Sequence, residues 1–377
     1  MGYIMDQDKM ALIASIRAFM EKEVKPISAE CDRSGEPPME VYKKAFDMGL
    51  HALDIPEEFG GAGIDYMTAL AICEEMGKVD AGFATTMVAC GLAIKPVLIA
   101  GTDEQKQYYA DIVNEGKFCA FCLTEPNAGS DAGATKTTAV LDGDEYVING
   151  SKCFITNGAL ADVYVVFASV DKSKGLKGIT AFIVERNRPG VSTGKEEDKM
   201  GIRLSNTCDV VFEDVRIPVK NRLGEEGEGF KIAMKTLDLS RPYVGVTAVG
   251  IAQRALDEAV KYSKERVTFG KPICKNQALQ FMMADMDMMI EAARQTCIHC
   301  IQRKEAGLPY TREAAIAKCL SGDVATKCAD NAIQILGGYG YSREYPVEKL
   351  WRDAKIFQIF EGTNQIQRVV IAGQLLK

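Results

Sequence analysis

Histidine and tryptophan are scarce in this chain of 377 residues, which has two of the former and one of the latter. The histidines, His51 and His299, lie far apart, and neither neighbours an acidic cluster. Histidine-based metal sites and Ser-His-Asp catalysis therefore have few candidate residues. We expect His51 to be a surface residue at a helix end and His299 to lie on a helix of a bundle.

Nucleotide-binding motifs and long apolar runs are also missing. The sequence has no GxGxxG after a predicted strand and no GxxxxGK[ST], which argues against a Rossmann fold and a P-loop. Its N-terminus resembles neither a signal peptide nor a transit peptide. No apolar run approaches the roughly 18–20 residues of a membrane span. We therefore expect a cytoplasmic protein with no membrane span, with a processed organellar form as the alternative.

A positive charge excess is absent. The chain has 45 Lys and Arg against 52 Asp and Glu, for a formal net charge of −7. We therefore expect no nucleic-acid partner. Hydrophobic residues make up 47% and charged residues 26%, which is typical of globular proteins. The length predicts roughly two to three domains.

Cysteine is plentiful, with twelve residues, but scattered along a long chain, so we expect reduced thiols. Cys119/Cys122 and Cys297/Cys300 have CxxC spacing and together could form a four-thiolate zinc site. We favour no metal, because residues three apart in the strand-like run of Cys119 and Cys122 face opposite ways. Cys297 and Cys300 resemble small core residues of a helix.

The hydrophobic period changes twice along the chain, which predicts an α+β fold, mostly α, in three domains. Residues 1–117 and 229–377 have helical spacing, whereas residues 118–228 contain short runs of β-formers separated by turns. No crossover helices are evident between those runs. We therefore predict a helical N-terminal domain, a middle antiparallel β-sheet or barrel, and a C-terminal helical bundle.

The individual elements can be placed from the same pattern. The expected strands are residues 118–123, 146–149, 163–169, 179–185 and 209–213. The expected C-terminal helices are residues 230–239, 244–266, 279–304 and 312–336.

Two segments of the middle region combine small, hydroxyl and aromatic residues. TEPNAGSD at 124–131 forms a loop in which backbone N–H groups can approach a ligand closely. CFITNG at 153–158 brings together an aromatic ring, a hydroxyl and an amide, which suits a flat cofactor. The alternatives are an ordinary polar turn and a strand end with a capping threonine.

Two helix ends combine arginine or glutamine with glycine. They are RVTFG at 266–270 and QILGGYG at 334–340. Arginine gives bidentate bonds to phosphate and glycine permits close approach, so both segments suit a diphosphate. The alternative is a helix C-terminus with a glycine cap.

Glu361 is the candidate base. It is flanked by Ile359 and Phe360 and followed by Gly362. An apolar setting raises the pKa of a carboxyl group and makes it a better base near neutrality. The alternative is a solvated glutamate at a helix start, where the helix dipole favours negative charge.

Together and in this order, these segments resemble those of the acyl-CoA dehydrogenase family. The matching motifs are TEPNAGSD, FITNG, FEDVRIP, ERVTFGKPI, QILGGYGY, YPVEKLWRDAKI and FEGTNQIQ. The resemblance covers essentially the whole chain. The nearest members are the short- and medium-chain enzymes, such as butyryl-CoA dehydrogenase. The resemblance implies a helical domain at 1–117, a β domain at 118–228, a four-helix bundle at 229–377, and a homotetramer with FAD at subunit contacts.

The resemblance also implies the site residues. The flavin would be held by Phe121, Leu123, Thr124, Ser130, Phe154, Ile155 and Thr156, with the Thr156 hydroxyl near N5. The adenosine diphosphate half would be held, across a subunit contact, by Arg266, Thr268, Phe269, Gln277, Gln334, Gly337 and Gly338. Thr363 and Gln365 would complete the FAD site. Acyl-CoA would be contacted by Ser130, Asp238, Arg241, Tyr243 and Gly362, and Glu361 would be the catalytic base.

Two positions distinguish this chain within the family. Many relatives have Trp at the position of Phe154, so the indole N–H donor is lost while a stacking face remains. A branch with isovaleryl-type and long-chain enzymes carries its base at the position of Ser240. Serine there, with Glu361 present, favours the short- and medium-chain arrangement.

The implied reaction is the dehydrogenation of a short- or medium-chain acyl-CoA to the trans-2-enoyl-CoA, with electrons passed to an electron-transferring flavoprotein. The acyl pocket would lie near 86–92 and 243–247, where Met87, Val88 and Tyr243 predict a modest apolar cavity. Three alternatives remain: an enoyl-CoA (acrylyl-CoA-type) reductase in an anaerobe, an acyl-CoA oxidase, and a non-catalytic acyl-CoA-binding protein.

Overall fold

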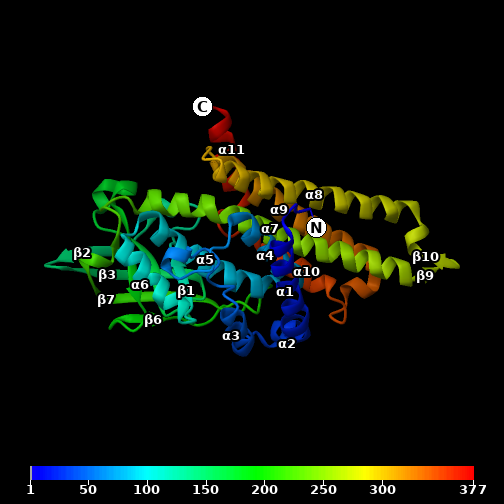
Figure 1. The fold of residues 1–377 in the computed structure, drawn as a ribbon, viewed down its shortest axis with the longest axis horizontal. Helices are drawn as coiled ribbons and strands as arrows, with labels where there is room; N and C mark the ends of the chain where they lie inside the picture. The colour runs from blue at the N-terminus through cyan, green and yellow to red at the C-terminus, as the bar shows by residue number, and fades with distance from the viewer. Residues whose placement is uncertain (1) are drawn as a thin grey trace.

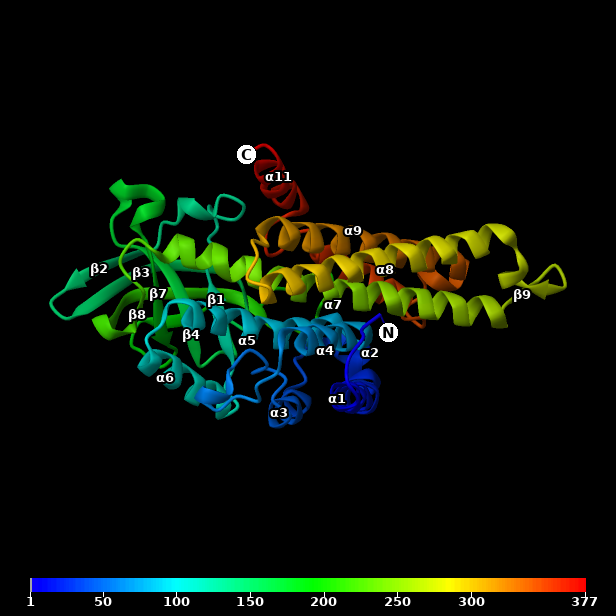
Figure 2. The same cartoon turned by 45° about the horizontal axis from the view of Figure 1, so that its top comes forward.

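The structure is a computed structural model that describes residues 2–377; its sheet lies at one end of the molecule, and long helices extend from there to the other end (Figures 1 and 2). The N-terminal region is helical. Its elements are α1 (Gln7–Phe19), a π-helical turn (Met20–Val24), α2 (Lys25–Ser34), α3 (Met39–Asp47), α4 (Tyr66–Val79), α5 (Ala81–Ala100) and α6 (Asp103–Asn114).

Polar caps begin several of these helices. The Asp6, Asp65 and Asp80 side chains accept backbone hydrogen bonds in the first turns of α1, α4 and α5. Thr102 and Gln105 form a reciprocal capping box at the start of α6. The starts of α1, α4, α5 and α6 are therefore set by polar side chains that satisfy otherwise free N–H groups.

Helix α5 corrects one expectation from the sequence. Its 20 residues have a mean hydropathy of 1.8, so by length and composition it could cross a membrane. The prediction that no apolar run reaches that length is therefore wrong. In the structure, 72% of this apolar window is buried within the protein, because α5 packs between α4, α7 and strand β1.

The middle region is a mixed β-sheet. Its strands are β1 (Cys119–Cys122), β2 (Thr138–Asp142), β3 (Glu145–Thr156), β4 (Val163–Ser169), β5 (Ile179–Glu185), β6 (Val191–Thr193), β7 (Thr207–Pro218) and β8 (Arg222–Leu223). They lie in the order β6-β7-β3-β2-β4-β5-β8, with β1 paired to β4.

Most strand pairs are antiparallel, as predicted, but two pairs are parallel. Strand β1 runs parallel to β4 along its whole length, and β2 meets β4 in parallel at Thr138 and Ser169. Parallel neighbours need a long connection. Here the β2–β3 hairpin and its flanking loops provide it, which a search for crossover helices could not detect.

The C-terminal region is a bundle around one long helix. Its elements are α7 (Gly229–Glu265), β9 (Val267–Thr268), β10 (Lys271–Pro272), α8 (Gln277–Glu305), α9 (Thr311–Leu336), a 3₁₀-helix (Gly337–Tyr341), α10 (Val347–Ile356) and α11 (Asn364–Leu375). Helix α7 starts beside the sheet and ends at the β9–β10 hairpin, at the opposite end of the molecule (Figure 1).

Two helices predicted for the first part of this region are in fact one. The break expected between residues 239 and 244 is absent, and Pro242 lies inside α7. Proline removes one backbone hydrogen bond there. The helix continues because α4, α5, α8 and α9 pack against it.

The two histidines lie in different environments. His51 is only 3% exposed, its ring stacks on Phe46 with centroids 3.9 Å apart, and burial lowers its pKa. The surface position predicted for it is therefore wrong. His299 lies on helix α8 of the bundle, as predicted, and its side chain is exposed. All twelve cysteines are free, and among residues 2–377 no group of three or more His, Cys, Asp or Glu could hold a metal.

Candidate active site

Glu361 lies in the loop between α10 and α11 with its carboxylate enclosed. The Ser240 hydroxyl on α7 donates a hydrogen bond to Glu361 Oε1 at 3.0 Å. Oε2 is buried and has no partner within the part of the chain that the structure describes. The alternative of a solvated glutamate at a helix start is therefore wrong, since α11 begins three residues later and water does not reach Oε2.

Burial and the neighbouring polar groups shift the pKa of Glu361 in opposite directions. Burial raises the pKa of its carboxyl group, while the Ser240 hydrogen bond and the cations Arg241, Lys95 and Lys318 limit that rise. A carboxylate whose pKa is raised takes a proton more readily near neutral pH. The site thus contains a base and a set of cations that keep it ionised.

The backbone of the loop is fixed by two side chains. Glu361 has a φ of 52°, in the left-handed region that is uncommon for a residue with a Cβ. Lys318 on α9 donates to the Gly362 carbonyl at 2.7 Å, and Gln367 donates to the carbonyls of Glu361 and Gly362. At Gly362, with a φ of 90°, a Cβ would meet Gln367 Nε2 at 2.6 Å, so only glycine fits.

Replacement of Lys318 by Met is expected to move the acid limb of the activity to higher pH. As the candidate base, Glu361 must be ionised, so the rate is expected to fall as pH drops through the Glu361 pKa. Lys318 lowers that pKa, and its removal therefore lets it rise, so activity is lost at a higher pH. Burial lowers the pKa of Lys318 itself to about 8, so it is largely cationic over this range.

The measurement is the rate of flavin reduction by acyl-CoA across a pH series. Lys327→Met on the same helix is the control, because the Lys327 side chain is 57% exposed. An acid limb that stays at the wild-type position in Lys318→Met would contradict this electrostatic account.

Asp238 and Arg241, predicted to contact acyl-CoA, form a buried pair near Glu361. Arg241 Nη1 donates to Asp238 Oδ1 at 2.6 Å, and the Thr311 hydroxyl donates to Oδ2 at 2.6 Å. The buried Nε of Arg241 has no partner among the residues described. Tyr243, one turn further along α7 from Ser240, is also buried. Arg241 and Gly362 therefore lie close to Glu361, Asp238 is bonded to Arg241, and Tyr243 lies on the same helix, whereas Ser130 is an exposed residue of the β-domain loop.

The two predicted flavin segments lie side by side. Cys153 N–H donates to the Thr124 carbonyl at 2.9 Å, which joins the 121–130 segment to the 153–156 segment. The side chains of Leu123 and Ile155 are buried in the core, so they can offer a ligand only their backbone. Phe121, Thr124 and Thr156 are half-buried.

Glu125 and Lys152 fix this loop, and the sequence analysis missed them. Lys152 is fully buried and donates to Glu125 Oε1 at 2.7 Å and to the Leu123 carbonyl at 3.1 Å. The Glu125 carboxylate also accepts the N–H groups of Lys136 and Thr137. A lysine inside an apolar strand run was the only signal available in the sequence.

Phe154 is directed outward by a β-bulge. The register of β3 against β7 shifts between Lys152 and Ile155, and Phe154 there has a φ of 54° and is 66% exposed. Bulges of this kind re-aim side chains next to binding sites. The ring is therefore presented to solvent with an open face.

The predicted diphosphate segments lie at the far end of α7. Arg266 caps α7, and its guanidinium carbon lies 5.7 Å from the centroid of the Tyr339 ring, so the 266–270 and 334–340 segments meet. Phe269, at the tip of the β9–β10 hairpin, is fully exposed with a φ of 51°. Gln277 and Gln334 are exposed, and Thr268 is half-buried. Gly337 and Gly338 have no atom within 4 Å of an added Cβ.

Thr363 and Gln365 line a hollow of about 340 Å³ beside α11. The Thr363 hydroxyl accepts the Ile366 N–H and so caps that helix. Its free lone pair remains available to a ligand in the hollow.

These features fit a bound FAD. Exposed aromatic rings on left-handed backbone and open glycines form surfaces that a flat, diphosphate-linked molecule would cover. The flavin segments belong to the sheet, beside which α7 starts, and the diphosphate segments lie beyond the C-terminal end of this helix, which is roughly 54 Å long at 1.5 Å per residue (Figure 1). One chain therefore offers both halves of a site without bringing them together.

The predicted acyl pocket is present but is less apolar than expected. A cavity of about 20 Å³ is lined by Met87, Val88 and Tyr243, and also by Asp54 and Lys95. The sequence analysis missed this charged pair, since 41 residues separate its members. The modest apolar cavity that was predicted is thus present, with a charged pair in its wall.

Sequence models of three domains match the chain in order. The acyl-CoA dehydrogenase N-terminal domain matches residues 6–117, the middle domain matches residues 120–215, and the C-terminal domain matches residues 227–376.

Individual relatives cover the chain from end to end. A short-chain specific acyl-CoA dehydrogenase of Clostridium acetobutylicum is 47% identical over 100% of both chains. An acryloyl-CoA reductase (NADH) of Anaerotignum propionicum is 45% identical over 100% of this chain and 96% of its own. A chain solved in a study of the electron transferring flavoprotein of Acidaminococcus fermentans has 49% identity and a TM-score of 0.97 over 100% of both chains.

Proposed function

The chain belongs to the acyl-CoA dehydrogenase family, and from that premise we propose that it removes one hydrogen each from Cα and Cβ of a short-chain acyl-CoA, with Glu361 as the base. It is an FAD-dependent oxidoreductase. The observation that carries the proposal is the enclosed Glu361 carboxylate, whose Oε2 has no partner among residues 2–377. The short acyl chain is supported by the name of the C. acetobutylicum relative.

Glu361 would take the α-proton onto Oε2. Ser240 holds Oε1, so the free oxygen has a defined direction. The Glu361 N–H has no acceptor among the described residues. Gln367 and Lys318 donate to the carbonyls of Glu361 and Gly362, and so hold the backbone on either side of it. That N–H would donate to the thioester oxygen as negative charge develops there. Bound FAD supplies the acceptor for the hydrogen that leaves Cβ.

The chain's cations support the same step. Arg241 and Lys318 lie near Glu361 and keep it ionised until substrate enters. An acyl chain that displaces water from the cavity would strengthen each of these interactions. The proton transfer thus occurs in an enclosed site with its charges already arranged.

The reverse reaction is a second candidate. The acryloyl-CoA reductase of A. propionicum is 45% identical over the whole chain, and the same residues would protonate Cα of an enoyl-CoA. For electron exchange we propose an electron-transferring flavoprotein as partner, as the A. fermentans neighbour supports.

We also propose a homotetramer, with domains at 1–117, 118–228 and 229–377. The domain models support these boundaries. Assembly is supported by the separated halves of the FAD site and by exposed apolar side chains. These are Val267 and Phe269 on the hairpin, Phe281 and Met288 on α8, and Val369, Leu375 and Leu376 at the C-terminal end. Helix α11 projects from the body (Figure 2), so a second copy can cover it. We propose a cytoplasmic location.

An anaerobic titration tests this function. The purified yellow protein is mixed with acetyl-, butyryl-, hexanoyl- and octanoyl-CoA, and flavin absorbance is followed. Bleaching by butyryl-CoA at the lowest concentration is expected, and a flavin that no acyl-CoA bleaches would contradict the proposal.

Light scattering on the same fraction should give four times the mass of one chain; a monomer that retains FAD would contradict the tetramer.

A further inference from the structure

A buried ion pair lines the predicted acyl cavity. Lys95 Nζ on α5 is 2.7 Å from Asp54 Oδ2, and the two side chains are 4% and 12% exposed. Lys95 also donates to the Gly91 carbonyl, and its Nζ lies 4.8 Å from the centroid of the Tyr243 ring. A Cβ at Gly91 would meet Asp54 Oδ2 at 2.4 Å, so the glycine makes room for the carboxylate.

Two further polar atoms in the same cavity wall have no partner. They are the Tyr243 hydroxyl and His51 Nδ1, both buried. His51 Nε2 lies 2.9 Å from the Val113 carbonyl, so Nε2 carries the proton and Nδ1 is an acceptor. The cavity therefore presents an unused donor and an unused acceptor, and leaving such groups unpaired costs stability.

The cavity adjoins the reacting centre. Ser240, which holds Glu361, and Tyr243 are three residues apart on α7 and so share one face of the helix. Lys95 is near enough to Glu361 to influence its pKa. A group at the far end of a bound acyl chain is therefore the part of the substrate that would meet Lys95, Asp54 and Tyr243.

We propose that the acyl group of the substrate ends in a hydroxyl that enters this cavity and bonds to Lys95, Asp54 and Tyr243. This rests on the proposed function and names the substrate class. A cavity of about 20 Å³ holds one small polar group. A hydroxyl both donates and accepts, so it satisfies Asp54 and Tyr243 together.

Other chain ends fit less well. The ion pair is neutral as a unit, so a carboxylate would face Asp54 and an ammonium would face Lys95. A methyl group would leave the Tyr243 hydroxyl unpaired. Sites built to bond a hydroxyl reject analogues that lack it far more strongly than apolar pockets discriminate by size.

The test compares matched thioesters. Butyryl-, valeryl- and hexanoyl-CoA and their ω-hydroxy counterparts are titrated into FAD-loaded Glu361→Gln protein by calorimetry, which measures binding without turnover. Flavin bleaching is followed in the wild type. At one chain length the hydroxy compound is expected to bind about tenfold or more tightly than its partner. Glutaryl-CoA is expected to bind more weakly than that hydroxy compound.

Two variants locate the preference. In Lys95→Met/Asp54→Leu both charges are removed together, so no buried charge is left alone, and the preference is expected to reverse in favour of the plain chain. Tyr243→Phe keeps the ring and is expected to reduce the preference on its own. Lys78→Met, at a partly exposed ion pair with Asp257, is the control and should keep the wild-type preference.

The outcomes separate the two proposals. Plain chains that bleach the flavin, with no hydroxyl preference at any length, would overturn the inference and leave the proposed function standing. Tighter binding of glutaryl-CoA would also overturn it. A flavin that responds to neither series would contradict the proposed function as well.

Discussion

Replacement of Glu361 by Gln is expected to slow flavin reduction by acyl-CoA about 10²- to 10⁴-fold, the usual contribution of a general base. The amide keeps the shape of the side chain and can still bond to Ser240 through its oxygen. It has no basic oxygen to take the α-proton. Stopped-flow absorbance under anaerobic conditions measures the rate directly.

Glu344→Gln is the matched control, because Glu344 is exposed and precedes α10 in the same stretch of chain. It should reduce its flavin at the wild-type rate. Binding of acyl-CoA to Glu361→Gln should persist, since the loop is held by Lys318 and Gln367 through its backbone. Flavin reduction within a few-fold of the wild-type rate in Glu361→Gln would show that the base lies elsewhere.

Lys349→Met is expected to destabilise the protein by about 3–5 kcal/mol, the usual effect of removing one partner from a buried ion pair. Lys349 on α10 bonds to Asp80 and Asp353, whose side chains are 0% and 1% exposed. Burial alone would lower the pKa of Lys349, but the two carboxylates raise it. Without the lysine, two buried carboxylates face each other.

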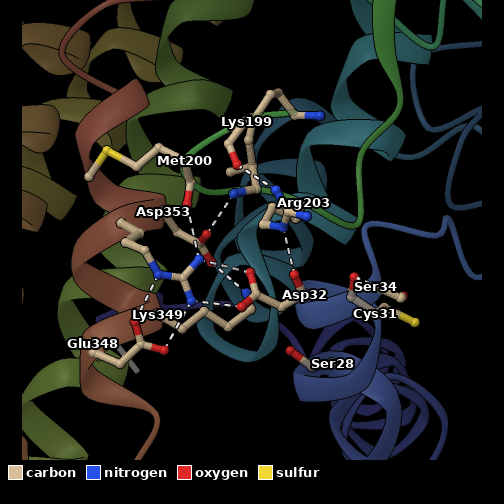
Figure 3. A network of polar contacts seen from close by, with 12 residues as sticks. Ser28, Cys31, Asp32, Ser34, Lys199, Met200, Arg203, Glu348, Lys349 and Asp353 are labelled. Carbon is tan, nitrogen blue, oxygen red and sulfur yellow. Dashed lines mark hydrogen bonds and ion pairs between the residues drawn. The ribbon is translucent and has the colours of Figure 1, made fainter. Parts of the chain in front are cut away.

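This lysine belongs to a network that fastens α10 to the rest of the chain (Figure 3). Arg352 bonds to Asp32 of α2 and to Glu348, and Asp353 accepts the Ile202 N–H at 2.6 Å. Ile202 has a φ of 47°, which is unusual for a β-branched residue and is sustained by this contact. Because α10 leads into the Glu361 loop, the network also positions the candidate base.

Urea unfolding of the FAD-loaded protein measures this effect. Lys355→Met, on the exposed side of the same helix, should unfold at the wild-type urea concentration. If Lys349→Met unfolds there too, the buried pair does not stabilise the fold.

The sequence predicted those parts of the fold that depend on local periodicity. The predicted strands at 163–169 and 179–185 match β4 and β5, and the helix predicted at 312–336 differs from α9 by one residue. Turn residues lie at the ends of these strands, and apolar runs make up their interiors. Residues that are neighbours in the sequence are therefore enough to predict these elements. The order of the helical, β-sheet and helical regions was predicted from the changes in hydrophobic period along the chain.

Several of the errors involve contacts between residues that lie far apart in the sequence. His51 is buried because Phe46 and the Val113 carbonyl enclose it, and β1 pairs with β4 across 44 positions. Pro242 is tolerated because four helices support α7. Local pattern carries no information about such partners.

The candidate site likewise has parts that the sequence predicted and parts that it did not. Family motifs indicated Glu361 and the cofactor segments, and the structure places Glu361 in an enclosed position. The residues that support these segments were missed, namely Lys152 beneath the flavin loop, Lys318 beneath the Glu361 loop, and the Asp54–Lys95 pair. Each is a buried lysine whose partner lies far away in the chain, so its burial could not be inferred from sequence.

Exchange of the α-hydrogen tests the central claim most directly. FAD-loaded protein is incubated anaerobically with butyryl-CoA in D₂O, and loss of the α-proton signal is followed by NMR. The wild type is expected to exchange the α-hydrogen through Glu361, and Glu361→Gln is expected to leave it in place. Exchange by Glu361→Gln at the wild-type rate would contradict the assignment of Glu361 as the base.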